Sequence, residues 1–391
     1  MKKLTLILLC ASAIMWGGVV AVKAQTFNAV MDSVQPRPSS TSFSASVVRN
    51  GAVRYVGSRG NPDPGAAARY MLASVTKQFT AAAILALEAD NKLDLDDPAS
   101  RFLTALPHWN RITVRNLLNH QTTLPDYVSG MPYMGGAAFQ SGISLSALLN
   151  IISTAAGVPT SRACLSYSNS NYAALTAIIE VAANQSFGSY LRSKIFQPLE
   201  MTQTSYTGGI QSDVARGHHG NGAPTGNYNT SWANGAGGIV TTARDMAKWN
   251  IAILDGFLDI AQRAQDDAVT GNCQFGGNPS SYAYGWIVGS NGVLEHSGVV
   301  EGYSTYNFVD IQRGVAVAVL TSFAGYSGGI AAFARTLSRA TTGGSPGPTT
   351  ASYCCTVVGR FGPGPNPTGQ AGLSCTWFTP MTGWMAGQTC P

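Results

Sequence analysis

Charged residues are scarce in this 391-residue chain, and their scarcity excludes several classes of protein. Only 11% of the residues are Asp, Glu, Lys or Arg, against roughly a quarter in an average soluble domain. This composition excludes charge-driven disorder and a charge-laced coiled coil. The net charge is +5, but Lys2, Lys3 and Lys23 lie in a leader that we expect to be removed, which leaves about +2. No field strong enough for generic nucleic-acid binding remains.

Metal-ligand patterns are also missing. None of the seven cysteines forms a Cys-x-x-Cys pair, and the five histidines do not have zinc-ligand spacing. The sequence therefore predicts no metal site and no cofactor.

Long apolar runs are absent except at the N-terminus. Residues 4–22 are uncharged, follow Lys2 and Lys3, and lead to Ala24, which is typical of a secretory signal peptide cut after Ala24. An uncleaved membrane anchor is the alternative, because the run is nearly long enough to span a bilayer. We expect residues 1–24 to be a signal peptide, and the mature chain to be secreted or periplasmic with no stable membrane span.

Six cysteines remain after the leader, and an even number in an exported chain favours disulfides. Cys164 is predicted to be a buried thiol or to be bridged to Cys273, rather than to act as a nucleophile.

The last fifty residues differ in composition from the rest. Residues 341–352 are rich in Gly, Pro, Ser and Thr and predict a linker. Residues 353–391 contain four cysteines, so this C-terminal extension is expected to depend on disulfides, with a disordered tail as the alternative. Trp377 and Trp384 could bind a polymer surface or pack against the main body.

Strand-like and helix-like patterns alternate along residues 25–340 in an informative order. Runs 43–48 and 53–56 flank Asn50-Gly51, a strong β-hairpin signal. Further strand-like runs are 282–288, 293–296, 305–311 and 315–322. Helical patterns are 72–90, 114–118, 145–152, 172–181, 246–254 and 330–339. Strands at both ends with helices between them predict one sheet assembled from both ends of this domain, with a helical subdomain over roughly 91–230.

The first candidate for chemistry is Ser74-Val75-Thr76-Lys77, at the start of the Ala-rich helical pattern. Positions i and i+3 share one helix face, so the hydroxyl and the amine can exchange a proton. Burial and the positive helix N-terminus lower the pKa of a lysine and make it a base for the serine. Ser-x-x-Lys alone is a weak signal, because ordinary surface helices also contain it.

Two further candidates have structural alternatives of their own. Tyr167-Ser168-Asn169 precedes a helix, so it could relay protons and bind a substrate carbonyl, or it could be a capping turn. His296-Ser297-Gly298 ends a strand-like run, where Gly298 would let a substrate lie against the strand edge. The backbone N–H of Val299 could then donate to an oxyanion.

These three motifs in this order resemble those of the penicillin-recognising serine hydrolases, which include class C β-lactamases, D-alanyl-D-alanine carboxypeptidases and related esterases. The resemblance covers roughly 43–339. It extends to Leu117-Leu118-Asn119-His120-Gln121-Thr122-Thr123-Leu124-Pro125 and to Ala236-Gly237-Gly238-Ile239 with 241–246, which look like two other family segments.

The resemblance implies an α/β (α+β) fold with an antiparallel sheet flanked by helices, and a cleft beside a helical subdomain. It implies that Ser74 is the acylated nucleophile, and that Lys77 and Tyr167 share the general-base work. His296 would be the third-motif catalytic residue, at a position that is usually lysine in β-lactamases. The implied substrate-binding residues are Asn169, Gly298, Val299 and Gln121. The N–H groups of Ser74 and Val299 would form the oxyanion hole.

The sequence also departs from the family pattern. His296 is charged only part of the time near neutral pH, which disfavours a dedicated β-lactamase, and binding of an acidic substrate through it should weaken as pH rises. Thr123 replaces a loop glycine, so the backbone of that loop could differ. No Glu-x-x-Leu-Asn stretch is present, which disfavours a class A mechanism.

The remaining histidines carry less weight. His218-His219 lies in a Gly- and Asn-rich loop and is expected to be solvated surface, whereas His120 is expected to anchor its loop by hydrogen bonds.

We therefore predict an exported serine hydrolase acting on a D-alanyl peptide, a small ester or a β-lactam. Its partners would be a small-molecule or peptide substrate and the cell wall. The alternative is a catalytically degenerate member of the family whose Cys-rich extension binds cell-wall material.

Overall fold

The computed structural model describes residues 26–34, 40–60, 65, 67–128, 140–271, 281–326 and 329–341. The predicted signal peptide, the C-terminal extension, Cys273 and the predicted linker beyond Thr341 lie outside these described residues. Within the described ranges, no helix is long and apolar enough to cross a membrane, and no cluster of His, Cys, Asp and Glu could hold a metal ion.

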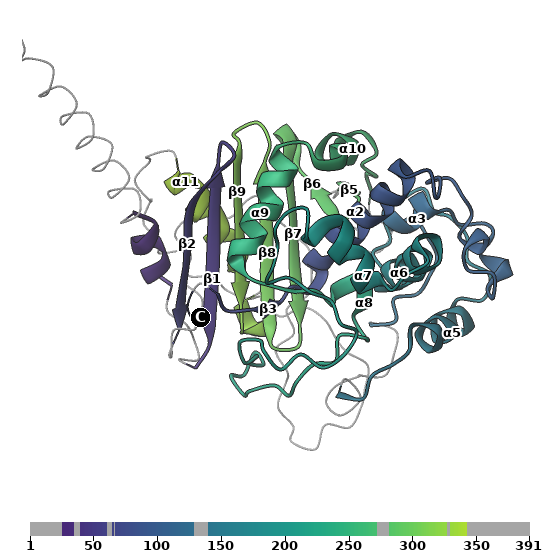
Figure 1. Cartoon of the computed structure of the whole chain (residues 1–391), viewed down its shortest axis with the longest axis horizontal. Coiled ribbons are helices and arrows are strands. Elements are labelled where there is room, and N and C mark those ends of the chain that lie inside the picture. The colour runs from purple at the N-terminus through teal and green to yellow at the C-terminus, as the bar shows by residue number, and fades with distance from the viewer. Residues whose placement is uncertain are drawn as a thin grey trace, which may run out of the picture.

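An antiparallel sheet of seven strands, in the order β2-β1-β9-β8-β7-β6-β5, forms one half of the molecule (Figure 1). The strands are β1 (Ser42–Arg49), β2 (Ala52–Gly60), β5 (Ser281–Ala283), β6 (Trp286–Val288), β7 (Val293–Val300), β8 (Tyr303–Asp310) and β9 (Val315–Thr321). Since β1 pairs with β9, the sheet is assembled from both ends of the domain, as the sequence predicts.

Two turns with positive φ angles define where strands of this sheet end. Asn50 and Gly51 have φ angles of 51° and 67°, which suits the tight hairpin expected between β1 and β2. Tyr284 and Gly285 have φ angles of 51° and 83°, so the run 282–288 is not the single strand that we predict from sequence. It is two strands, β5 and β6, joined at this turn, because the backbone reverses direction there.

Helices cover both faces of the sheet. Successive strand residues point to opposite sides, and on β9 both sets are apolar and buried. On β9, Ala316, Ala318 and Leu320 belong to the core cluster that includes α9 (Ala243–Leu254). Val317 and Val319 belong to the second cluster, with α11 (Ile330–Ala340) and a helix over residues 26–32. Helices α9 and α11 therefore pack on opposite faces of the sheet.

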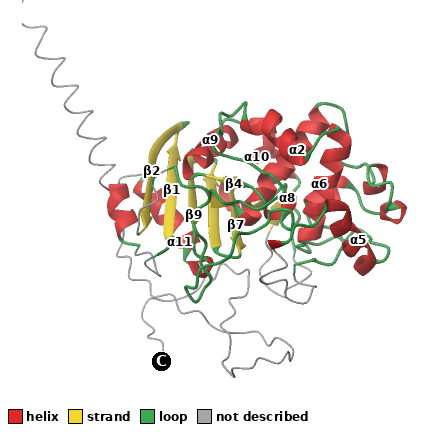
Figure 2. Ribbon diagram, turned by 60° about the horizontal axis from the view of Figure 1, so that its bottom comes forward, coloured by secondary structure: helices red, strands yellow, loops and turns green. Residues whose placement is uncertain are grey.

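The other half of the molecule is mostly helical (Figure 2). Its longer helices are α2 (Thr76–Ala89), α5 (Leu145–Ala156) and α6 (Asn169–Ala183). Shorter helices are α3 (Val114–Leu118), α7 (Phe187–Leu191), the π-helical segment η4 (Arg192–Phe196), α8 (Asn234–Gly237) and α10 (Ile260–Asp266). Helix α2 is buried almost throughout and packs against α6 and α8, so its first turn lies between the sheet and the helical half.

Candidate active site

Ser74 lies on a short 3-10 turn, η1 (Ala73–Val75), that leads into α2, rather than on the α-helix itself. The preceding strand β3 (Tyr70–Met71) pairs with β4 (Val240–Thr241), and Leu72 N–H donates to the carbonyl of Ile239 at 2.8 Å. Ala73 has a φ angle of 50°, an uncommon conformation for a residue with a side chain. The turn that presents Ser74 is therefore fixed by pairing on its N-terminal side and by the helix on its C-terminal side.

Lys77 is fully buried, and its amine contacts three oxygen atoms. The Nζ atom lies 3.2 Å from Ser74 Oγ, 2.8 Å from Asn169 Oδ1 and 2.8 Å from the Ala236 carbonyl oxygen. The structure thus brings the first two sequence motifs together and adds the carbonyl of Ala236, which belongs to the Ala-Gly-Gly segment.

Burial lowers the pKa of Lys77 to about 7, and the nearby charge of Asp126 opposes this shift. Asn169 Oδ1 and the Ala236 carbonyl can only accept, so a neutral amine donates its two N–H bonds to them. Its lone pair then faces the Ser74 hydroxyl. The geometry suits proton abstraction from Ser74 by Lys77 near neutral pH.

Tyr167 contacts both Ser74 and Lys77. Its phenol shares a side-chain hydrogen bond with Ser74, and its ring centroid is 4.9 Å from Lys77 Nζ. Burial raises the pKa of Tyr167 well above its usual value, so the phenol stays protonated at neutral pH. Tyr167 is therefore placed to relay a proton, while Lys77 is the group able to accept one.

Asn169, the first residue of α6, is held by a carboxylate that the sequence analysis missed. Its Nδ2 lies 3.1 Å and 3.2 Å from the two carboxylate oxygens of Asp126. The available signal was position alone, since Asp126 directly follows Leu124-Pro125 of the family-like loop in a chain with few acids.

The imidazole of His296 has both nitrogen atoms occupied within the protein. Nδ1 donates to the Ser297 carbonyl at 2.6 Å, and Nε2 accepts from the hydroxyl of Tyr282 at 3.2 Å. Burial, with a smaller contribution from the charge of Lys77, lowers the pKa of His296 to about 3. His296 is therefore neutral, which differs from the partial charge that we predict from its type alone, and Tyr282 is a second residue that the motifs did not reveal.

Gly298 presses against the turn that carries Ser74. A Cβ atom there would lie 2.7 Å from the Leu72 carbonyl oxygen and 3.0 Å from Ala73 Cβ. Strand β7 therefore packs directly against the turn that carries Ser74. Gln121 is instead tied to the adjacent loop, where its Nε2 donates to the Arg162 carbonyl at 3.2 Å.

The loop that follows α3 is anchored by His120, as the sequence predicts. Its Nδ1 accepts from the backbone N–H of Ser168 at 3.2 Å and from Asn171 Nδ2 at 3.1 Å. Thr123, in place of the family glycine, has no positive φ angle, and it exchanges hydrogen bonds with the backbone of Thr160. The substitution therefore does not require a strained backbone.

His218 is buried, contrary to the expected solvated loop, because the loop folds back onto the turn between β7 and β8. Its backbone N–H donates to Gly302, and its ring contacts Ser40 Oγ at 3.1 Å and the Ser322 carbonyl at 3.3 Å. His219 is more exposed and lies 3.5 Å from Glu301.

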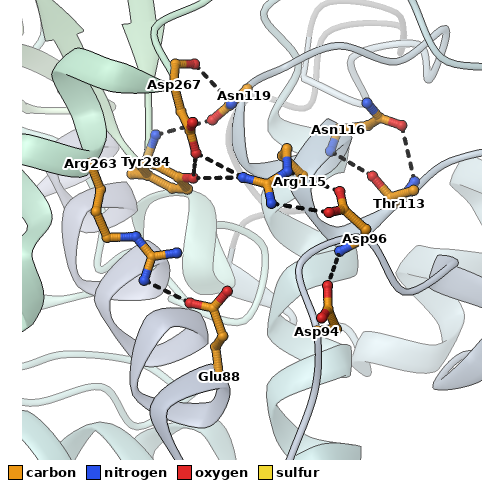
Figure 3. Close-up of polar contacts among 10 residues, drawn as sticks. All are labelled: Glu88, Asp94, Asp96, Thr113, Arg115, Asn116, Asn119, Arg263, Asp267 and Tyr284. Carbon is orange, nitrogen blue, oxygen red and sulfur yellow. Dashed lines mark hydrogen bonds and ion pairs between the residues drawn. The ribbon is translucent and has the colours of Figure 1, made fainter. Parts of the chain in front are cut away.

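A polar cluster behind the site holds the turn between β5 and β6 (Figure 3). Arg115 Nη1 donates to Asp267 at 2.7 Å and to the Tyr284 hydroxyl at 3.2 Å, and Tyr284 donates to Asp267. The neighbouring Gly285 lies so close to α2 that a Cβ atom would be 2.6 Å from the backbone of Lys77. The cluster therefore supports the backbone from which the Lys77 side chain extends.

Replacing Arg115 by methionine should lower the free energy of unfolding by about 1–3 kcal/mol, because the carboxylates of Asp96 and Asp267 and the phenol of Tyr284 lose a charged hydrogen-bond donor. The measurement is urea unfolding at pH 7.5, with exposed Arg111→Met as the control, which we expect to stay within about 0.5 kcal/mol of wild type. Equal stability of the two variants would contradict a supporting role for the cluster.

Comparisons with known proteins agree with this geometry. A family model described as Beta-lactamase matches residues 27–341. PbpX of Bacillus subtilis, described as a candidate penicillin-binding protein, is 29% identical over 243 residues, which cover 61% of this chain and 58% of that protein. The chain thus spans little more than half the length of this relative.

Solved structures share the fold. The D-amino acid amidase of Ochrobactrum anthropi superimposes with a TM-score of 0.70 at 24% identity, covering 82% of this chain and 98% of the amidase. An octameric penicillin-binding protein homologue of Pyrococcus abyssi gives a TM-score of 0.65 at 24% identity, covering 78% of this chain and 74% of that chain. The expected antiparallel sheet with flanking helices is therefore confirmed.

Proposed function

This chain belongs to the Beta-lactamase family, the penicillin-recognising serine hydrolases, and on that basis we propose that it is an exported hydrolase that cleaves an amide or ester through an acyl-enzyme on Ser74. The single observation that carries the proposal is the buried amine of Lys77, held by Asn169 Oδ1 and the Ala236 carbonyl and directed at Ser74 Oγ.

The proposed reaction begins with transfer of the Ser74 hydroxyl proton to the lone pair of Lys77. Ser74 Oγ bonds to the substrate carbonyl carbon, and the carbonyl oxygen becomes an oxyanion that faces the N–H groups of Ser74 and Val299. The proton then passes from Lys77, through the phenol of Tyr167, to the leaving nitrogen or oxygen as its bond to carbon breaks. Water attacks the acyl-enzyme in the same way, its proton returns to Ser74, and the acid product leaves.

A neutral amide or ester is the substrate class that the site favours. His296 is uncharged and fully hydrogen-bonded, so it presents no cation to the carboxylate of a β-lactam or a D-alanyl peptide. The fold shared with an enzyme named as a D-amino acid amidase supports this preference, without identifying the acyl group.

Export is part of the proposal because two independent features support it. The N-terminal sequence has the pattern of a secretory signal, and Cys164 is disulfide-bonded in the structure. Disulfides persist mainly in oxidising compartments.

The test is covalent labelling of the purified full chain with a fluorophosphonate, followed by intact mass spectrometry. We expect one adduct per chain, located on Ser74, and no adduct on Ser74→Ala. Ser40→Ala is the matched control and should label normally, since Ser40 Oγ also contacts an imidazole, that of His218.

Labelling that persists in Ser74→Ala, or that never occurs in folded wild type, would reject the acyl-enzyme and leave the degenerate alternative. A panel of p-nitrophenyl esters, a D-amino acid amide, nitrocefin and a D-alanyl-D-alanine peptide then separates the substrate classes. We expect faster turnover of the uncharged ester or amide than of the two carboxylate-bearing compounds.

A further inference from the structure

The carboxylate of Asp126 accepts hydrogen bonds from three N–H donors near the start of α6. Oδ1 accepts from the Asn169 backbone at 3.2 Å, from Asn169 Nδ2 at 3.1 Å and from the Val128 backbone at 3.1 Å. Oδ2 lies 3.2 Å from the same Nδ2. Asp126 therefore accepts hydrogen bonds from both the backbone and the side-chain amide of Asn169.

The hydrogen bonds from Asn169 Nδ2 to Asp126 determine which end of the Asn169 amide faces Lys77. An ionised carboxylate only accepts, so it requires the NH₂ end of the amide on its own side. The Oδ1 end is then turned to Lys77 Nζ, 2.8 Å away. With the amide reversed, two N–H groups and a lysine amine would face each other, and Lys77 would lose one of its two acceptor-only partners.

Asp126 also acts on Lys77 through its charge. Its negative potential favours the ammonium form and raises the pKa of Lys77, against the larger lowering caused by burial. The other titratable side chains around this amine carry no charge at neutral pH, because burial raises the pKa of each phenol and lowers that of each imidazole. They are Tyr167 from the segment before α6, Tyr172 from α6, His296 from β7, and His120 from the loop after α3.

We propose that Asp126 is a positioning residue for the reaction: it fixes the orientation of the Asn169 amide, and its charge favours the ammonium form of the amine that activates Ser74. The proposal rests on the proposed acyl-enzyme function and adds to it a residue that acts through Asn169. A merely structural role is the alternative, because a carboxylate at a helix N-terminus also stabilises that helix.

The experiment compares Asp126→Asn and Asp126→Ala with wild type in the full chain, using the pH dependence of fluorophosphonate labelling at Ser74. Removing the negative charge makes the ammonium form of Lys77 less favourable. We therefore expect the acid limb of the rate to move to lower pH by about 0.5 unit or more, the effect of a single neighbouring charge. At the high-pH plateau we expect the rate to fall about tenfold in Asp126→Ala, where the Asn169 amide is free to reverse.

Two controls separate the positioning role of Asp126 from a merely structural effect. Asp266→Asn removes an exposed carboxylate on α10 and should leave both the limb and the plateau unchanged. In an Asn169→Ala background, Asp126→Ala should cause little further loss at the plateau, because the two residues act through one amide.

The proposal would be overturned if the pH profile of the labelling rate in Asp126→Asn and Asp126→Ala matched wild type in both its acid limb and its plateau. A change in melting temperature alone would not rescue it. A shifted limb with an unchanged plateau would overturn the orientation role. Lys77 can also be titrated directly by ¹³C NMR of its ε-methylene, assigned with Lys77→Met. That measurement tests Asp126 even if wild type fails to label, an outcome that would reject the proposed function instead.

Discussion

Lys77→Met should lower kcat/KM by about 10²–10⁴-fold, the range expected for loss of a general base. Methionine keeps the apolar volume of the side chain but leaves Ser74 Oγ with no group to take its proton. The measurement is steady-state hydrolysis of the best ester or amide in the substrate panel. Lys92→Met, at an exposed lysine just beyond α2, should match wild type.

The role of Lys77 as the base also determines in which direction kcat/KM changes with pH. Because Lys77 must be neutral to accept a proton and its pKa is about 7, kcat/KM should fall as pH drops below 7 and level off above it. The phenol of Tyr167, whose pKa is raised, should not ionise in this window. A rate that is flat between pH 5 and 8 would contradict Lys77 as the base.

The free energy of unfolding should rise with pH, whereas a lysine held in a stabilising ion pair would make it fall as pH rises. The pKa of Lys77 is lowered from 10.5 in the unfolded chain to about 7 in the folded one. Between these values the unfolded chain holds a proton that the folded chain lacks. The stability of wild type relative to Lys77→Met should therefore rise with pH across this window, by about 1.4 kcal/mol per pH unit. Denaturant unfolding at pH 7.5 and 9.5 measures the slope, and a slope of zero would contradict the buried amine.

The family and the general architecture could be predicted from sequence because both depend on local signals. The Asn50-Gly51 turn and the Ser-x-x-Lys spacing are each defined within a few residues. The family assigned from three short motifs is confirmed by a family model that matches 27–341.

The groups that hold Lys77, Asn169 and His296 could not be predicted because they come from segments far apart in the chain. The carboxylate of Asp126 comes from the loop after α3, the carbonyl of Ala236 from α8 and the hydroxyl of Tyr282 from β5, and they meet only once the chain has folded. Their packing, rather than their residue type, gives Lys77 and His296 their charge states. The same reason explains why His218, in a polar loop, is nevertheless buried.

Gly298 is a site residue predicted from sequence, but the structure gives a different physical reason why glycine is needed there. The sequence analysis assigns Gly298 to substrate clearance, whereas the structure adds a packing requirement. A Cβ atom would lie 2.4 Å from Thr305 Oγ1 and 2.7 Å from the Leu72 carbonyl oxygen. Thr305 already donates to that carbonyl at 2.7 Å, so neither neighbour can move away freely.

Gly298→Ala should therefore push β7 away from the turn that carries Ser74 and lower the rate of fluorophosphonate labelling by about 10²-fold, as expected when reacting groups shift by about 1 Å. Gly289→Ala, just after the end of β6, is the control, since its nearest neighbour would lie 3.4 Å from the added atom. The fluorophosphonate is small, so it distinguishes the two explanations. If Gly298 only made room for a long substrate, the probe would react normally and only KM for larger substrates would rise. If the strand must touch Leu72 and Ala73 to hold Ser74 in place, the small probe loses reactivity as well.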